Sequence, residues 1–66
     1  MKLRDIMKQR RETLSLTQVD LAEMSQVSLA TIKDIERGKG NPTLNKVTKI
    51  LDILGIEIEY RIRQTV

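Results

Sequence analysis

The sequence predicts a mainly α-helical fold, a compact domain of four short helices followed by one C-terminal β-strand. Apolar residues recur at helical spacing through most of the chain, and capping and breaking residues divide that pattern into four pieces. From residue 56 the apolar period changes from 3.6 to 2. With 66 residues the core must be small, so we expect support from helix packing and from a second copy of the chain.

The first two helices are predicted over residues 2–13 and 18–24. Thr17 is a suitable N-cap for the second helix, and Asp20 three residues later makes a variant of the capping box. The residues 25–27 then interrupt the helical pattern. The apolar residues at helical spacing in these two segments, and directly after the first, are Leu3, Ile6, Met7, Leu14, Val19, Leu21, Ala22 and Met24.

The next two helices are predicted over residues 29–37 and 44–54. Ser28 and Thr43 are their N-caps, and Gly38 suits the left-handed residue that ends the third helix. The fourth helix ends in the same way at the glycine that follows it. From the apolar faces of the helices we predict a core of Leu21, Met24, Val27, Ile32, Ile35, Leu44, Val47, Ile50 and Leu54.

The tail alternates isoleucine and tyrosine with charged residues, which predicts a half-buried strand. We therefore divide the chain into a helical domain over 1–55 and a strand over 56–66. A lone strand leaves its backbone groups unpaired, and a second copy is the simplest source of a partner strand. Antiparallel pairing about Tyr60 would place glutamates opposite arginines, while a tail that folds back or stays disordered is the alternative. The predicted dimer residues are Ile53, Ile58, Glu59, Tyr60, Arg61 and Ile62.

Composition excludes several kinds of chemistry. The chain contains neither His nor Cys, so imidazole catalysis, thiol catalysis and disulfides are excluded. No tight acidic cluster or phosphate-binding glycine run is present, and we expect no enzyme, metal, cofactor or small-molecule substrate. No apolar run reaches membrane-spanning length, so we expect no membrane contact and a cytoplasmic location.

The positive charge is unevenly placed. The net charge is +3, and residues 1–11 hold five basic side chains against Asp5 alone. Lys33, Arg37 and Lys39 form a second basic group. Such charges can belong to an ordinary solvated face or to a nucleic-acid surface, and a structural motif has to decide between them.

The second and third predicted helices supply that motif. They are joined by a turn of three to four residues, and the small Ala22 lies where they should cross closely. This arrangement predicts a helix-turn-helix, whose second helix can enter the major groove of DNA.

Several segments taken together resemble the XRE, or lambda-repressor-like, helix-turn-helix family. They are Leu16-Thr17-Gln18-Val19-Asp20-Leu21-Ala22, Val27-Ser28, Thr31-Ile32, Ile35-Glu36-Arg37-Gly38 and Pro42-Thr43-Leu44. The resemblance implies a helical bundle that binds a pseudo-palindromic operator as a dimer. In this family the turn usually contains glycine, where this chain has Gln26. If Gln26 is left-handed, the change costs up to about 1 kcal/mol.

The resemblance also implies roles for single residues. It places Gln18 against a DNA phosphate, and it makes Arg11 and Glu36 a structural ion pair. On the third helix, Leu29, Ala30, Lys33 and Asp34 are expected to share the outward face. Lys33 could donate to guanine, Leu29 and Ala30 could contact thymine methyl groups, and Thr31 could bind either a phosphate or its own helix. The complete set of predicted DNA-binding residues is Gln18, Ser28, Leu29, Ala30, Thr31, Lys33, Asp34, Arg37, Lys39 and Asn41. We expect Arg4, Lys8 and Arg10 to act through long-range electrostatics or at the rim.

Two functions follow as hypotheses. The first is a sequence-specific DNA-binding transcriptional repressor that acts as a homodimer. The second is an antitoxin that holds a toxin protein, because Ala30-Thr31-Ile32 followed by a terminal strand resembles HipB-type antitoxins. In that subgroup the strands of two subunits pair, and the protein represses its operon and binds a kinase-like toxin.

Overall fold

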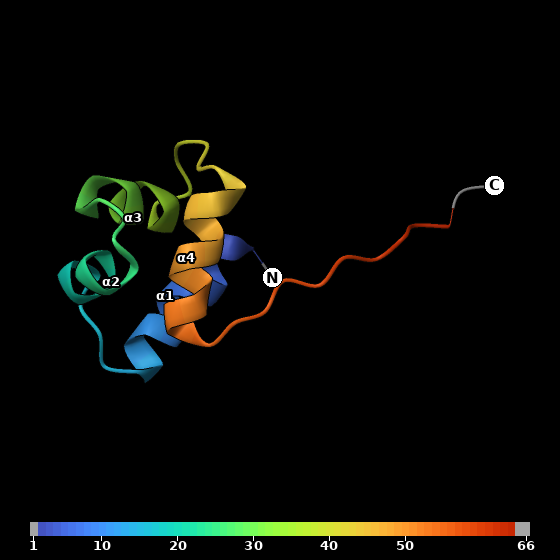
Figure 1. Ribbon diagram of the computed structural model, residues 1–66. Helices are drawn as coiled ribbons and strands as arrows, with labels where there is room; N and C mark the ends of the chain where they lie inside the picture. The colour runs from blue at the N-terminus through green and yellow to red at the C-terminus, as the bar shows by residue number, and fades with distance from the viewer. Residues whose placement is uncertain (1, 65–66) are drawn as a thin grey trace.

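The computed structural model describes residues 2–64 and confirms the four helices (Figure 1). They are α1 (Leu3–Thr13), α2 (Gln18–Ser25), α3 (Leu29–Glu36) and α4 (Leu44–Leu54). The outermost residues of the two predicted units, 1 and 65–66, lie outside the described residues. Within residues 2–64 no helix has the length and apolar character needed to cross a bilayer.

Polar caps begin three of the helices as predicted. At α2 the Asp20 N–H donates to the Thr17 hydroxyl (2.9 Å), while the Thr17 N–H donates to the Asp20 carboxylate (2.9 Å). These reciprocal bonds form the capping box and satisfy two backbone donors. Ser28 and Thr43 accept from the third helical N–H of α3 and α4, at 3.2 and 3.3 Å.

Left-handed residues follow α2, α3 and α4. Gly38 after α3 has φ +73° and Gly55 after α4 has φ +70°, a region that glycine enters without a Cβ clash. After α2 the position is occupied by Gln26, with φ 59° and ψ 32°. The substitution of glutamine for the usual glycine therefore does place a side chain in a disfavoured conformation, at a cost of up to about 1 kcal/mol.

The core lies where α2 and α1 both pack against α3 and α4. Met24 and Leu44 were expected there, but they are 53% and 58% exposed. The buried face of α2 is formed by Leu21, Ala22 and Ser25, which turns Met24 outward. Leu44 is the first residue of α4, whose buried residues all lie in its second half. The core residues are Met7, Leu21, Ala22, Val27, Ile32, Ile35, Ile50, Leu51 and Leu54.

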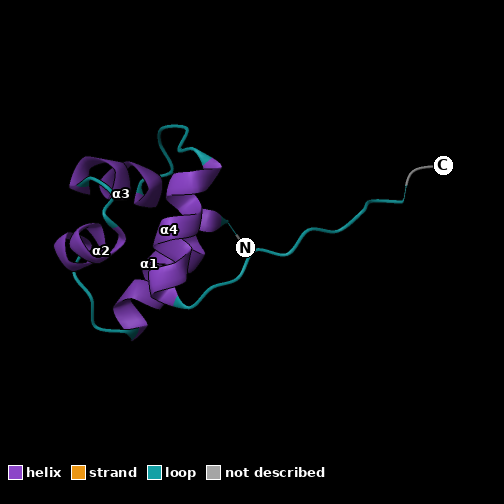
Figure 2. Ribbon diagram, viewed as in Figure 1, coloured by secondary structure: helices purple, strands orange, loops and turns teal. Residues whose placement is uncertain are grey.

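The tail does not form a strand within the single chain. Figure 2 shows it as an extended segment that leaves the helical body, with no strand among residues 2–64. Its first residue is held, because the Ile56 N–H donates to the Leu51 carbonyl (3.0 Å) and its side chain packs on the core. Residues 57–64 are exposed. The predicted strand is thus not supported by the single chain, which offers no second strand to share its hydrogen bonds.

Candidate nucleic-acid interface

The turn between α2 and α3 is built from buried apolar contacts. The Val27 N–H donates to the Ala22 carbonyl (3.2 Å), and both side chains are buried. Since the small Ala22 takes little space, α2 and α3 can pack closely at the turn. Ile32 and Ile35 then fix the rotation of α3 by facing the core, which leaves the opposite side of that helix exposed.

The exposed side of α3 carries part of the predicted base-reading set. Ala30, Lys33 and Arg37 are exposed, as is the capping Ser28. Leu29 was expected on the same face, but it is half-buried and packs against the core. It stands at the first position of α3, next to the α2–α3 turn, where apolar surface is close enough to cover it.

Thr31 lies beside Ser28 on the first turn of α3. The two hydroxyls are 2.8 Å apart, so Thr31 has a polar partner on its own helix rather than a side chain directed only at solvent. The pair presents two hydroxyls at the N-terminal end of α3, where backbone N–H groups also face outward. Such a group of donors suits a negatively charged ligand.

Ion pairs occupy the acidic side chains of this region. Asp34 pairs with Arg37 on the next turn, and Glu36 pairs with Arg11 from α1. Among residues 2–64, no carboxylate lies within ion-pair distance of Lys33 or Lys39. Both lysines are exposed. The surface around α3 therefore presents positive charge, with exposed Asn41 beyond it in the α3–α4 loop.

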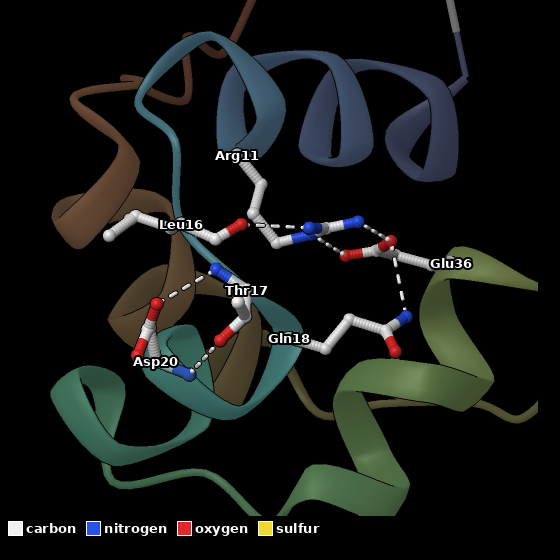
Figure 3. Close-up of polar contacts among 6 residues, drawn as sticks. All are labelled: Arg11, Leu16, Thr17, Gln18, Asp20 and Glu36. Atoms are coloured by element: carbon white, nitrogen blue, oxygen red, sulfur yellow. Dashed lines mark hydrogen bonds and ion pairs between the residues drawn. The ribbon is translucent and has the colours of Figure 1, made fainter.

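Arg11 and Glu36 form a bidentate ion pair between α1 and α3 (Figure 3). Arg11 Nε and Nη2 donate to the two carboxylate oxygens of Glu36 at 2.8 and 2.9 Å, and Arg11 Nη1 donates to the Leu16 carbonyl at 2.8 Å. Only 12% of the arginine side chain and 4% of the glutamate side chain are exposed. Hydrogen bonding to Glu36 raises the pKa of Arg11 above its ordinary value. The pair thus joins α1, the α1–α2 loop and α3.

Gln18 extends this network to α2. Its Nε2 lies 3.4 Å from Glu36 Oε1, a long hydrogen bond, and the residue stands at the first position of α2 (Figure 3). The first helical bond is made by the Leu21 N–H to the Thr17 carbonyl, so the N–H groups of Gln18 and Val19 have no helical acceptor. A half-buried amide is therefore positioned beside free backbone donors at the start of α2.

Two basic residues of α1 have contacts that the sequence did not predict. Arg10 Nε donates to the Leu54 carbonyl (2.9 Å), so Arg10 caps the C-terminal end of α4 instead of acting only at long range. Arg4 lies against the backbone of Gly38, and together with Lys2 and Lys39 it lines one shallow hollow. The charge near the N-terminus therefore continues the positive surface that follows α3.

The predicted dimer residues fall into two groups. Ile53 on α4 is half-buried and packs against the core. The others lie on the tail, where Ile58, Tyr60 and Ile62 are 39%, 78% and 100% exposed. Glu59 and Arg61 between them are exposed as well. The single chain thus leaves an apolar row without cover.

Comparison with known proteins agrees with this architecture. A family model described as Helix-turn-helix matches residues 7–61. Over 59 residues the chain is 34% identical to the cryptic phage CTXphi transcriptional repressor RstR of Vibrio cholerae serotype O1, covering 89% of this chain and 53% of that protein. It is 40% identical over 48 residues to the immunity repressor protein of Bacillus phage phi105, covering 73% of this chain and 33% of the repressor.

A third relative is of archaeal origin. The chain is 47% identical over 45 residues to the uncharacterized HTH-type transcriptional regulator MJ0272 of Methanocaldococcus jannaschii, covering 68% of each. The chain spans about half and one third of the length of the two phage repressors. The family-model match over residues 7–61 begins within α1 and includes α2, the α2–α3 turn, α3 and α4. The chain belongs to the XRE-type helix-turn-helix family.

Proposed function

We propose that the chain represses transcription by binding a specific double-stranded DNA sequence as a homodimer. The observation that carries the proposal is the exposed, positively charged side of α3, where Lys33 has no acidic partner within the described chain. A helix fits the major groove, and a lysine there can donate to the acceptor atoms of guanine. The names of the two phage repressors support the regulatory part of the proposal.

The start of α2 gives the complex its register. The Gln18 side chain and the adjacent free N–H groups can donate to a phosphate on one side of the groove, helped by the helix dipole. Ser28 and Thr31 belong to the start of α3. Lys39 and Asn41 follow α3 and are suited to contact the DNA backbone on the other side of the major groove. Arg37 is exposed but paired with Asp34. It therefore adds positive charge near the DNA groove, while some of its N–H donors are already bonded to Asp34. Backbone contacts of this kind position a protein, and base contacts give it specificity.

A dimer would place two copies of α3 on successive turns of DNA. Half-sites one helical turn apart have centres separated by about 34–36 Å. The proposal involves no catalytic step, in keeping with a chain without His and Cys. The antitoxin alternative and its toxin partner stay a prediction, since no feature of α1–α4 favours them over repression.

Two substitutions separate base readout from backbone contact. The binding site is first selected from a random duplex library, and affinities are then measured for the selected and for scrambled DNA. Lys33→Ala should lower affinity for the selected duplex by about 1–3 kcal/mol, because a base contact is lost, and relax the preference at that position. Gln18→Ala should weaken both duplexes similarly, because phosphate contacts carry no sequence information.

Lys8→Ala is the matched control for the lost charge. Lys8 is exposed on α1 and borders a shallow hollow with Asp5, Gln9 and Glu12, all of them residues of α1. This variant should keep the preference for the selected duplex and lose a little affinity for every duplex. If Lys33→Ala behaved like Lys8→Ala, α3 would not be the base-reading element.

A further inference from the structure

We propose that the tails of two copies pair as an antiparallel ribbon whose two-fold axis passes through Tyr60. The proposal rests on the dimer proposed above and specifies how it is assembled. It starts from the apolar row of Ile58, Tyr60 and Ile62, whose exposure in the single chain rises from 39% to 78% and 100% along the tail. The same segment of a second copy covers this row. The charge pattern of the tail selects the register in which the two segments pair.

The alternation of side chains excludes half of the possible registers. Directly opposed residues in an antiparallel pair point to the same face. From residue 56 to residue 63 the even-numbered positions are apolar and the odd-numbered ones are charged. A register that opposes an even position to an odd one would put charges among the apolar side chains. The two-fold axis therefore passes through a residue and not between two residues.

Charge then selects one axis among those that remain. With the axis at Tyr60, Glu57 faces Arg63 of the other copy and Glu59 faces Arg61, so every charged pair is opposite in sign. An axis at Ile58 opposes Glu57 to Glu59, and an axis at Ile62 opposes Arg61 to Arg63. Like charges directly opposite destabilise a strand pair.

Axes through charged residues are excluded for the same reason. An axis at Glu59 opposes that residue to itself, and an axis at Arg61 does likewise. The register at Tyr60 also opposes the two tyrosine rings to each other, and a cross-strand aromatic pair adds to stability. Of the registers centred on residues 58–62, only this one has no like-charge contact.

The root of the tail offers cover for the apolar face of the ribbon. An isolated two-stranded ribbon is marginal in water and needs packing on one face. A groove beside α4 is lined by Leu51, Ile56 and Ile58, with Thr48, Asp52, Glu57 and Tyr60 around them. In the proposed register Ile62 of the second copy lies opposite Ile58. The Ile62 side chain, fully exposed in the single chain, is thereby brought to the groove.

The register also sets the placement of the two helical domains. The two-fold axis is perpendicular to the ribbon, so both domains lie on the same face of it. Ten residue steps separate Gly55 of one copy from Gly55 of the other, which is roughly 33 Å along the ribbon.

Single cysteines test the register directly, because the natural chain contains none. In the proposed ribbon, Cα atoms of the two residues 60 are about 4.5–5.5 Å apart, within disulfide reach. Tyr60→Cys should therefore cross-link to itself under mild oxidation. Ile58→Cys and Ile62→Cys should each cross-link to themselves at least about tenfold more slowly, because their Cα atoms are roughly 13 Å apart. The last two variants should cross-link to each other when mixed.

Charge inversion gives a second test that keeps Tyr60. Glu57→Lys with Glu59→Lys should shift the dimer toward monomer in sedimentation at low salt, and Arg61→Glu with Arg63→Glu should do the same. The four changes together restore opposite charges in this register and should restore the dimer. Self cross-linking of Ile58→Cys or Ile62→Cys as fast as that of Tyr60→Cys, or a fourfold variant that stays monomeric, would overturn the register. Specific DNA binding that persisted alongside either result would leave the proposed function standing.

Discussion

At the scale of single residues, the carboxylate of Glu36 links three segments of the domain. It accepts two hydrogen bonds from Arg11 on α1 and faces Gln18 on α2, while it is itself carried by α3. The carboxylate is almost fully buried, so its charge depends on these partners for compensation. The helix that we propose to enter DNA is therefore tied at its C-terminal end to the two helices behind it.

Glu36→Ala should destabilise the domain by roughly 3–5 kcal/mol, because it leaves the Arg11 charge buried and unpaired. A domain of this size has a total stability of only about 3–10 kcal/mol, so the melting temperature should fall sharply. Glu23→Ala is the control, since Glu23 is an exposed residue of α2 outside the ion pairs of residues 2–64. Circular dichroism melts of the two variants make the comparison, and equal melting temperatures would contradict the account.

Some residue-level contacts could not be predicted from sequence. The resemblance implied the Arg11–Glu36 pair, but nothing in the sequence distinguishes Arg10 from its basic neighbours, and its contact with α4 follows from tertiary packing. Ser15 takes φ 56° in the α1–α2 loop, where no glycine marks the left-handed position. The partial burial of Leu29 likewise depends on the rotation of α3 about its own axis. The apolar periodicity of the sequence predicts that rotation only coarsely.

At the scale of secondary structure, local chemistry decided most of the fold. Capping hydroxyls, left-handed residues after helices and a 3.6-residue apolar period act within one or two turns, so their effects can be predicted without knowing the tertiary structure. The four helices and their caps were predicted to within a residue or two on these grounds. Which apolar residues are buried depends on neighbouring helices, and for that reason Met24 and Leu44 were misplaced.

The capping box of α2 should make stability depend on pH in the acid range. The Thr17 backbone N–H and hydroxyl lower the pKa of Asp20 below its ordinary value. A carboxyl whose pKa is lower in the folded state contributes stability that is complete above its unfolded pKa, near 4, and is lost as the pH falls through the folded pKa.

Asp20→Asn isolates this contribution, because it keeps the shape and one acceptor but does not titrate. Urea midpoints of the wild type and this variant should differ at pH 7, with the wild type more stable. The difference should shrink as the pH falls below about 4, since all other carboxyl groups titrate in both proteins. A difference that stays constant between these pH values would show that the Asp20 charge does not support α2.

At the scale of the whole molecule, the helical body and the tail depend on different partners. The body has its own core and hydrogen-bonded helix ends, whereas Tyr60 and Ile62 on the apolar face of the tail are largely exposed in the single chain. A strand could be predicted from the alternation in the tail, but the pairing that would make it a strand involves atoms outside the chain. The positive surface around α3 also has its proposed partner, DNA, outside the chain, although the chain alone forms that surface.

The central claim is that this chain binds one duplex sequence in preference to others. The most direct test measures the dissociation constants for a library-selected duplex and a scrambled duplex of equal length, at salt concentrations from about 50 to about 200 mM. We expect binding to the selected duplex to be at least about a thousandfold tighter at the higher salt. The logarithm of each association constant should fall steeply and linearly with the logarithm of the salt concentration, because contacts to phosphate release counterions. Equal affinity for the two duplexes across this range would contradict sequence-specific binding.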